Sequence, residues 1–421
     1  MEIELRYGDG RKLIRIPDRV DVTILKPSET PTVGSIADAL EKVLVDPLGC
    51  ESFQQMLRRA DPETIAIAVP DETRPAPLKP ILPVILEEIR KTLPALNPSA
   101  ITIIIGGGLH PPLDDNGRER VVPRHIAPGC RIIAHDARRD PMVDYGLTSR
   151  KTPVRINADF AGADFKIVIG QIDPHQFVGF TGGAKGVVIG CAASETIEHN
   201  HSLMFHEGAR VGRIAGNPVR EDLNEAGEMI GIQLALNLVL DAEKNIVQML
   251  AGQPLEVLEM GAKTCSAVYG VGIGEKFDIV IASCGGHPKD ICLYQAQKGL
   301  NLASQALSPG GHILLLAASP QGVGDDIYFD YVSQFTTPED VLRDFQKTGF
   351  QMGAHKAYLF GRTLADFDVA ISSDLDPGIL RKCHLRAADP TVIVGEWVDA
   401  FKGRPRIAVV PNANTTYFYH G

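Results

Sequence analysis

The stretch KIVIGQIDPH, residues 166–175, decides the fold, because an apolar run leads directly into a polar turn. A strand that is apolar on both faces is typical of a buried parallel sheet. Five more stretches share the pattern: IAIAV 65–69, TIII 102–105, RIIA 131–134, DIVIA 278–282 and ILLLA 313–317. Helical periodicity occupies the intervals at 35–45, with Ser35 as N-cap, and at 78–92, 222–230 and 290–307. This alternation predicts an α/β fold with largely parallel sheets.

The chain is long enough for two α/β domains, since 421 residues exceed what one hydrophobic core normally serves. The segment 261–277 is rich in glycine and small residues and precedes a new strand, so we place a boundary there. We predict an N-terminal cofactor-binding domain over 1–270 and a C-terminal domain over 271–404. Residues 405–421 are expected to return to the first domain.

Composition limits the partners and the compartment. The net charge is −10 and no long basic stripe occurs, so neither nucleic acid nor an anionic membrane is an expected partner. No apolar run has the length of a membrane span, and the first residues lack the apolar core of a signal peptide. The seven cysteines are scattered without a CxxC pair, which predicts reduced thiols in the cytoplasm rather than disulfides or a zinc site.

Polar and titratable side chains follow the ends of several predicted strands. Asp71 and Arg74 follow the strand at 65–69, His110 follows 102–105, and His175 follows 166–170. Taken singly, each of these residues is also explained by a structural role, in a surface ion pair, in a tight turn or as a hydrogen-bonded polar residue. Together they lie where open α/β sheets bind ligands, beyond the carboxyl ends of the strands. We therefore expect an active-site cleft between the two domains.

The helix predicted after the strand at 278–282 carries a second polar group. Tyr294, Gln295 and Lys298 are spaced three and four residues apart, so they share one helix face. A phenol, an amide and an ammonium on one face are suited to hold a carboxylate, although a solvated face gives the same pattern. The start of this helix at a strand end favours substrate binding.

Lys185 stands in the segment TGGAKG among apolar neighbours. The segment lacks the spacing of a nucleotide-binding P-loop, because Gly186 follows the lysine where a serine or threonine is required. The backbone N–H groups of Thr181, Gly182 and Gly183 are candidates for a phosphate-binding nest.

Five motifs taken in order resemble the lactate racemase family, whose members use a nickel-pincer nucleotide. The motifs are DETRP, GLHPP, DPHQFVGFTGGAKGVVIG, HNHS at 199–202 and LYQAQKG, and they span residues 71–298. The resemblance implies a racemase or epimerase that inverts the second carbon of a 2-hydroxy acid, lactate or a related short-chain acid. It also implies loading by cofactor-synthesis proteins.

Residue roles are carried over from the same resemblance. Lys185 matches the lysine that binds the cofactor covalently, His201 matches the nickel ligand, and His110 and His175 match the acid/base pair. Three further residues match those that bind the substrate carboxylate in the family, namely Arg74, Gln295 and Lys298. Tyr294 is expected beside them, and Asp71 is expected to orient Arg74.

The expected chemistry follows from the substrate. Reversible hydride removal from the second carbon gives a 2-keto acid and avoids a carbanion, and the cofactor carries that step. One histidine for each enantiomer would take and return the hydroxyl proton, since imidazole titrates near neutral pH. His199 competes with His201 as nickel ligand, and only the motif match favours His201.

Two departures from the family pattern concern the pocket wall. The late tryptophan of the lactate enzymes has no clear match, since Trp397 lies too far along and Tyr358 lies nearer the expected place. The sequence at His110 reads HPP, whereas a basic residue often follows this histidine in the family. Two other hypotheses remain, a non-catalytic protein that binds small anions and a lyase that forms a Schiff base at Lys185.

Overall fold

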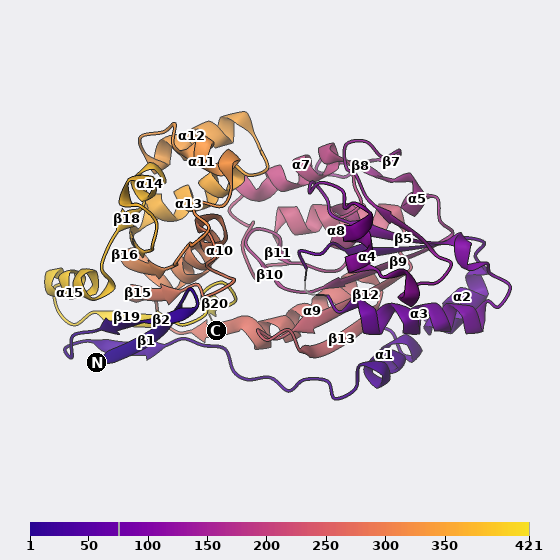
Figure 1. Ribbon diagram of the computed structural model, residues 1–421, viewed down its shortest axis with the longest axis horizontal. Helices are drawn as coiled ribbons and strands as arrows, with labels where there is room; N and C mark the ends of the chain where they lie inside the picture. Colours follow the sequence, from indigo (N-terminus) through magenta and orange to yellow (C-terminus); the bar gives the residue numbers. More distant parts are fainter. Residues whose placement is uncertain (75, 421) are drawn as a thin grey trace. The chain divides into compact units, whose positions relative to one another are not determined.

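The computed structural model describes residues 1–74 and 76–420, and the chain divides into two compact units. Unit 1 contains Met1–Ser28 together with the chain from Tyr269 onward, and unit 2 contains Glu29–Val268 (Figure 1). Each unit has its own sheet and its own buried core.

Unit 2 is built on a six-stranded sheet in the order β13-β12-β9-β4-β5-β6. All neighbours are parallel except β12 and β13, which are antiparallel. Its strands are β4 (Ile65–Pro70), β5 (Ile101–Gly106), β6 (Arg131–Ala134), β9 (Phe165–Gln171), β12 (Leu234–Leu240) and β13 (Ile246–Gly252). Two small pairs are added, β7 (Met142–Leu147) with β8 (Pro153–Asn157), and β10 (Pro174–His175) with β11 (Gly179–Phe180).

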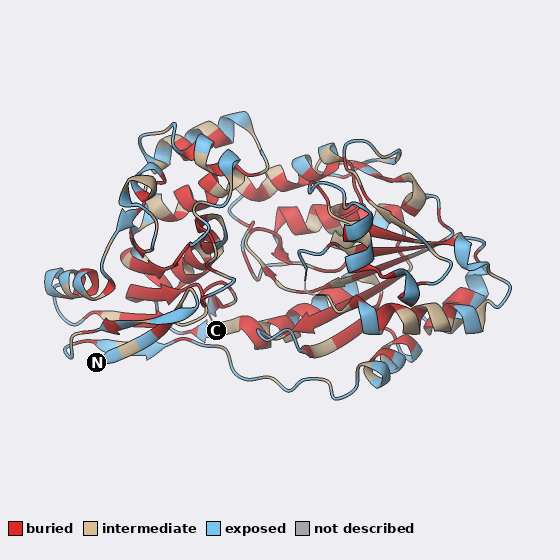
Figure 2. Ribbon diagram, in the orientation of Figure 1, coloured by how far each residue is buried: buried red, intermediate tan, exposed pale blue. Residues whose placement is uncertain are grey.

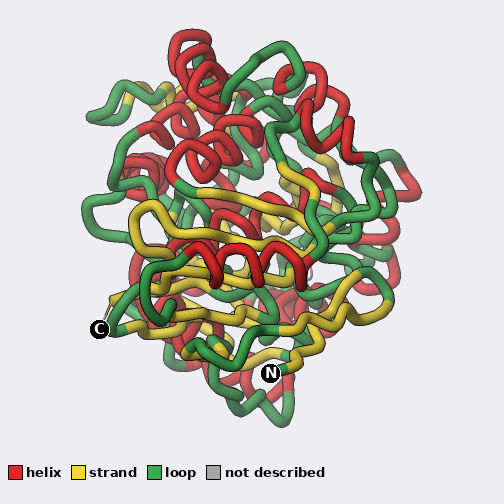
Figure 3. The backbone as a smooth tube through the Cα atoms, turned by 90° about the vertical axis from the view of Figure 1, so that its left-hand side faces the viewer, coloured by secondary structure: helices red, strands yellow, loops and turns green. Residues whose placement is uncertain are grey.

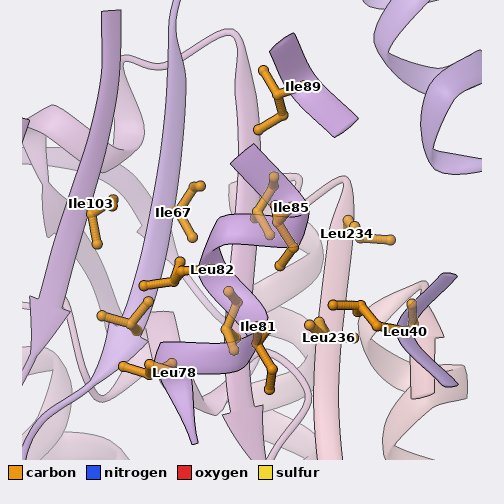
Figure 4. Packing of buried hydrophobic residues seen from close by; sticks show 14 of the residues in the cluster. Leu40, Ile67, Leu78, Ile81, Leu82, Ile85, Ile89, Ile103, Leu234 and Leu236 are labelled. Atoms are coloured by element: carbon orange, nitrogen blue, oxygen red, sulfur yellow. The ribbon is translucent and has the colours of Figure 1, made fainter. Parts of the chain in front are cut away.

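The helices of unit 2 connect and cover these strands. They are α1 (Ile36–Val45), α2 (Phe53–Ala60), α3 (Leu78–Thr92), α4 (Asp115–Val121), α5 (Ala158–Ala161), α6 (Lys185–Val188), α7 (Ser194–Ser202), α8 (Pro218–Ile230) and α9 (Pro254–Tyr269). Helix α3 shows why the layer forms, because Ile81, Leu82 and Ile85 recur on one face and are fully buried. In Figure 4 this face lies against the sheet residues Ile67 and Ile103.

Unit 1 has a second six-stranded sheet, in the order β18-β17-β16-β15-β19-β3, and every pairing in it is parallel. The strands are β3 (Asp21–Ile24), β15 (Phe277–Ser283), β16 (Leu307–Leu316), β17 (Asp368–Ser372), β18 (Arg386–Ala387) and β19 (Arg406–Val410). Beside it lie the hairpin β1 (Glu2–Tyr7) and β2 (Gly10–Arg15), and the parallel pair β14 (Gly270–Ile273) and β20 (Tyr417–His420).

The helices of unit 1 are α10 (Leu293–Ala303), α11 (Asp326–Val332), α12 (Pro338–Thr348), α13 (His355–Asp366), α14 (Pro377–Lys382) and α15 (Pro390–Ala400). The tube in Figure 3 shows yellow strands running side by side with red helices next to them. The central strands of the two sheets, such as β4, β12 and β15, are deeply buried and are drawn largely in red in Figure 2. The predicted α/β class with largely parallel sheets is confirmed.

The predicted elements agree closely with the observed ones. Strand β9 extends the predicted 166–170 by one residue at each end, and α3 has the predicted bounds of 78–92. The Ser35 side chain accepts a hydrogen bond from Asp38 N at 3.2 Å, so the predicted N-cap of α1 is present. Apolar runs and caps are local signals, which explains why they could be recognised without the fold.

The division of the chain differs from the predicted domains in two places. The boundary near 270 agrees with the observed division between Val268 and Tyr269. Residues 1–28, however, belong to unit 1, because β3 pairs with β19 and completes the edge of that sheet. Residues 405–421 do not return to the first domain either, since β19 pairs with β15 inside unit 1.

Candidate functional site

Asp71 and His110 form a close pair at the carboxyl ends of β4 and β5. The distance between Asp71 Oδ2 and His110 Nδ1 is 2.7 Å, and Thr73 donates to Asp71 Oδ1 through its hydroxyl at 2.6 Å. Burial alone would raise the pKa of Asp71, but the bonds from His110 and Thr73 outweigh it and the pKa is lowered. The carboxylate therefore stays ionised and fixes a proton on His110 Nδ1.

Asp71 differs from the prediction, in which it orients Arg74. Its carboxylate contacts His110 and Thr73, and its bond to Arg74 joins backbone atoms, Arg74 N to Asp71 O at 3.2 Å. The Arg74 side chain is exposed in the turn after β4, and its charge acts on Lys185. Arg74 and Lys185 are thus brought into one neighbourhood.

The turn that carries His110 is joined to the chain just after α6. Gly108 N donates to Gly190 O at 3.0 Å, and Gly108 has a φ of +58°, which only glycine adopts without strain. A Cβ on Gly108 would also lie 3.0 Å from Ile189 O. This contact places the His110 turn beside the helix that begins with Lys185.

His175 and His201 meet the same aromatic ring. His175 lies in β10, and its ring centroid is 4.6 Å from that of Phe177 in an edge arrangement. The Phe177 ring is in turn 5.1 Å from that of His201, which is buried in the last turn of α7. Val178 N donates to His175 Nδ1 at 3.3 Å.

His199 lies in a different environment from His201. Its Nδ1 atom is 2.8 Å from Thr152 Oγ1, and that hydroxyl also donates to Asp222 Oδ2 at 2.8 Å. His199 is thereby held in a buried polar network, whereas His201 faces the ring that His175 also contacts. His201, unlike His199, therefore shares the aromatic neighbour Phe177 with His175, and its role as nickel ligand stays a prediction.

The loop before Lys185 is held by bonds within the protein. Thr181 N donates to Asp173 O at 2.8 Å, and Gly183 N donates to Asn237 Oδ1 at 2.7 Å. The predicted phosphate nest is therefore wrong for these two N–H groups, which are already occupied. Gly182 has a φ of +87°, and a Cβ there would lie 2.4 Å from Ile172 Cγ1. The glycines serve tight packing of the loop.

Lys185 is the first residue of α6 and is half-buried. Burial, together with the charges of Arg74 and Arg220, lowers the pKa of Lys185 from its ordinary 10.5 to about 7. A large fraction of the amine is consequently neutral at physiological pH, which makes it a nucleophile. The interpretation of Lys185 as the residue that binds the cofactor stays a prediction.

Arg220 is a site residue that the sequence analysis missed. It is fully buried on α8, and its guanidinium donates to Val178 O at 3.4 Å, to Gly182 O at 3.3 Å and to Phe180 O. These carbonyls belong to the loop between His175 and Lys185. A signal was present, because Arg220 lies three residues before Leu223 on the apolar face of α8.

Unit 1 brings together the residues predicted to hold a carboxylate. Tyr294, Gln295 and Lys298 lie in the first two turns of α10, with Gln295 exposed and the other two half-buried. Lys356, the second residue of α13, was not predicted from the sequence, and its Nζ is 5.1 Å from the Tyr294 ring centroid. Burial and the charge of Lys298 lower the pKa of Lys356 to about 8.

The two residues considered as a late pocket aromatic lie on different helices of unit 1, Tyr358 on α13 and Trp397 on α15. Tyr358 is buried and stacks on Phe345 with centroids 5.4 Å apart. Trp397 stacks on His312 with centroids 5.0 Å apart and donates through Nε1 to Asp368. The two polar sets lie in separate units, and the predicted cleft between the domains stays a prediction.

Three properties of the described residues bear on the remaining expectations. All seven cysteines are free thiols. Within residues 1–74 and 76–420, no group of three or more His, Cys, Asp or Glu side chains is arranged to hold a metal ion. In the same residues, no helix combines the length and apolar character needed to cross a membrane.

In chemical terms, unit 2 holds a histidine paired with a carboxylate, two histidines next to one aromatic ring and a lysine whose pKa is lowered to about 7. Such groups at the strand ends of an α/β sheet are typical of enzymes that transfer protons. Residues 7–212 match the lactate racemase N-terminal domain, and residues 274–413 match the lactate racemase C-terminal domain. The chain belongs to the lactate racemase family and is an isomerase.

Individual relatives agree with this assignment. The lactate racemase of Lactiplantibacillus plantarum is 29% identical over 386 residues, 89% of each chain. That of Thermoanaerobacterium thermosaccharolyticum is 28% identical over 352 residues, 82% of this chain and 81% of the relative. The structure of the lactate racemase apoprotein from the latter organism matches with a TM-score of 0.89 at 26% identity, covering all of both chains. A Thermotoga maritima structure with a TM-score of 0.61 and 18% identity shares the fold, covering 94% of this chain and all of that one.

Proposed function

We propose that the protein is a racemase or epimerase of a 2-hydroxy acid, lactate or a related short-chain acid, with a nickel-pincer nucleotide attached to Lys185. The observation that carries the proposal is the lowered pKa of Lys185, about 7, inside the motif that the family uses for its cofactor. The same unit holds the Asp71–His110 pair and the contact of His175 and His201 through Phe177.

The residues present fit this cofactor. A neutral amine at Lys185 can be acylated without leaving a charge to bury, and the imidazole of His201 is a suitable nickel ligand. In this proposal the remaining nickel ligands come from the organic group, since the described residues form no larger metal-binding cluster. When bound, the cofactor would supply a reversible acceptor for hydride from the second carbon.

The hydrogen bonds of the two histidines favour complementary roles. Asp71 accepts from His110 Nδ1, so a neutral His110 carries its lone pair on Nε2 and is ready to accept a proton. Val178 N donates to His175 Nδ1, so a neutral His175 carries its proton on Nε2 and is ready to donate. One takes the hydroxyl proton and the other returns a proton to the keto oxygen, after which the roles are exchanged.

The substrate carboxylate is assigned to Arg74 of unit 2 and to Gln295 and Lys298 of unit 1, with Tyr294 beside them. Arginine suits a bidentate grip on a carboxylate, and lysine adds a point charge. We also propose that cofactor-synthesis proteins load the enzyme and that it works in the cytoplasm, where the free thiols remain reduced.

The test is a panel of enantiopure 2-hydroxy acids given to protein from a host that carries the cofactor-synthesis enzymes. We expect an adduct of a few hundred daltons at Lys185, bound nickel, and conversion of each active enantiomer into the racemate. A loaded protein that racemises no member of the panel would refute the proposal. Protein that acquires neither adduct nor nickel under these conditions would support a non-catalytic anion-binding protein.

A second candidate, a Schiff-base lyase, is favoured by the same lowered pKa, since a neutral lysine also attacks carbonyl carbons. Borohydride reduction in the presence of a 2-keto acid distinguishes the two functions. The lyase requires a stable adduct at Lys185 in metal-free protein, and the racemase requires none.

A further inference from the structure

Helix α8 holds the loop that connects His175 with Lys185. Two side chains at the start of this helix, from its N-cap Asn217 and its third residue Arg220, donate to loop carbonyls. Asn217 Nδ2 donates to Phe177 O at 2.9 Å, and the Arg220 guanidinium reaches the alternate carbonyls of Val178, Phe180 and Gly182. One planar group with several donors thus fixes the loop over five residues.

The charge of Arg220 is unusual because it is buried among neutral acceptors. The ion pairs of the described residues include none for Arg220, and its remaining contact is the amide oxygen of Asn224 at 3.5 Å. Burial lowers the pKa of Arg220 to about 9. A cation without a carboxylate partner is costly to bury, so hydrogen bonding alone is a weak reason for a guanidinium here.

The neighbours of Lys185 explain what this charge does. The charges that act on Lys185 are those of Arg74, after β4, and Arg220, on α8, and both are positive. The carboxylates next to Arg220 in α8 are held elsewhere, Glu221 by Arg150 and Asp222 by Thr152. Burial and these two positive charges together disfavour the protonated form of the amine, and within the described residues only Arg220 of the two arginines is held by hydrogen bonds of its side chain.

We propose that Arg220 is a positioning residue that both fixes the backbone leading into Lys185 and, by its adjacent positive charge, keeps the Lys185 amine nucleophilic near neutral pH. The inference rests on the proposed function in one respect, that Lys185 is the residue to be modified. The reactivity of the amine belongs to the protein before any cofactor is attached.

The experiment measures the acetylation of Lys185 in the full-length apoprotein as a function of pH. The neutral amine attacks a carbonyl carbon of acetic anhydride, the anhydride C–O bond breaks, acetate leaves, and the proton is released to water. Peptide mass spectrometry compares the rate at Lys185 with that at Lys79, which is exposed on α3. The expected midpoint for Lys185 is about 7.

Two variants separate the charge from the geometry. Arg220→Gln removes the charge, and the midpoint of Lys185 should rise by roughly half a pH unit or more. Arg220→Lys keeps the charge but loses the planar fork, so its midpoint should stay closer to that of the wild type. A folded Arg220→Gln variant with an unchanged midpoint would overturn the proposal. If the variants do not fold, the wild type decides, because a Lys185 midpoint equal to that of Lys79 also overturns it.

The same samples distinguish this inference from the proposed function. A low Lys185 midpoint that depends on Arg220, in a protein that never acquires the cofactor adduct, supports the inference and refutes cofactor attachment at Lys185. An adduct at Lys185, combined with a midpoint that is unchanged in Arg220→Gln, supports cofactor attachment and refutes the inference.

Discussion

Replacing Lys185 with methionine should stabilise the apoprotein, because the wild type carries an amine that is disfavoured in its protonated form. The pKa of Lys185 falls from 10.5 to about 7 on folding. A difference of about 3.5 at ~1.36 kcal/mol for each pKa unit sets an upper limit of about 5 kcal/mol. Lys185 is only half-buried, so solvent screening reduces this to about 2 kcal/mol in favour of Lys185→Met at pH 6.

The change of this stability difference with pH tests the explanation. Between pH 7 and 10.5 the unfolded wild type binds a proton at Lys185 that the folded protein has lost, so wild-type stability rises with pH in this window. The advantage of Lys185→Met should therefore shrink toward zero as the pH approaches 10. Urea unfolding followed by circular dichroism measures both proteins at pH 6 and 9.5.

Two controls make this result interpretable. Lys79→Met removes an exposed lysine from the same unit and should show no comparable gain. The fluorescence of Trp397, the single tryptophan, follows unit 1 in the same samples. A stability gap that is constant between pH 6 and 9.5, or that grows with pH, would refute the reasoning about Lys185.

Further predictions follow from the other contacts of unit 2. Asp71→Asn removes the acceptor that fixes His110, and we expect kcat of the loaded enzyme to fall about 10- to 100-fold with the protein still folded; an unchanged kcat would contradict the pairing. His201→Ala should lose nickel, measured by metal analysis, whereas the matched His199→Ala should retain it, and the reverse pattern would exchange their roles. Gly182→Ala places a Cβ 2.4 Å from a neighbouring side chain at a φ of +87°, so the free energy of unfolding should fall by about 1 to 3 kcal/mol. An unchanged urea unfolding curve would contradict that packing.

The strands of the two sheets, and the polar residues that follow them, could be located from the sequence. Strands such as β4 and β9 are apolar on both faces, and this local pattern located their ends and the polar residues that follow them. The place of β3 could not be predicted in the same way, because its partner β19 lies far along the chain. Pairing between distant strands depends on the whole fold and leaves no local pattern.

The errors within the site have similar physical causes. Asp71 lies three residues from Arg74, which suggested their pairing, but the turn after β5 brings His110 to the carboxylate instead. The glycines before Lys185 resembled an anion nest until Asn237, from β12, was found to occupy one of their N–H groups. In both cases an element distant in sequence supplied the partner, and residue spacing alone carries no such information.

The pairing of β3 with β19 also determines the order in which the two units can fold while the chain is being synthesised. Unit 2 is one continuous segment between β3 and β14, so every strand of its sheet has been synthesised before most of unit 1 exists. The sheet of unit 1 must wait for β19, and β3 must remain unpaired in it until then. The loop between His175 and Lys185 can consequently reach its folded form on the nascent chain before helix α10 has been made.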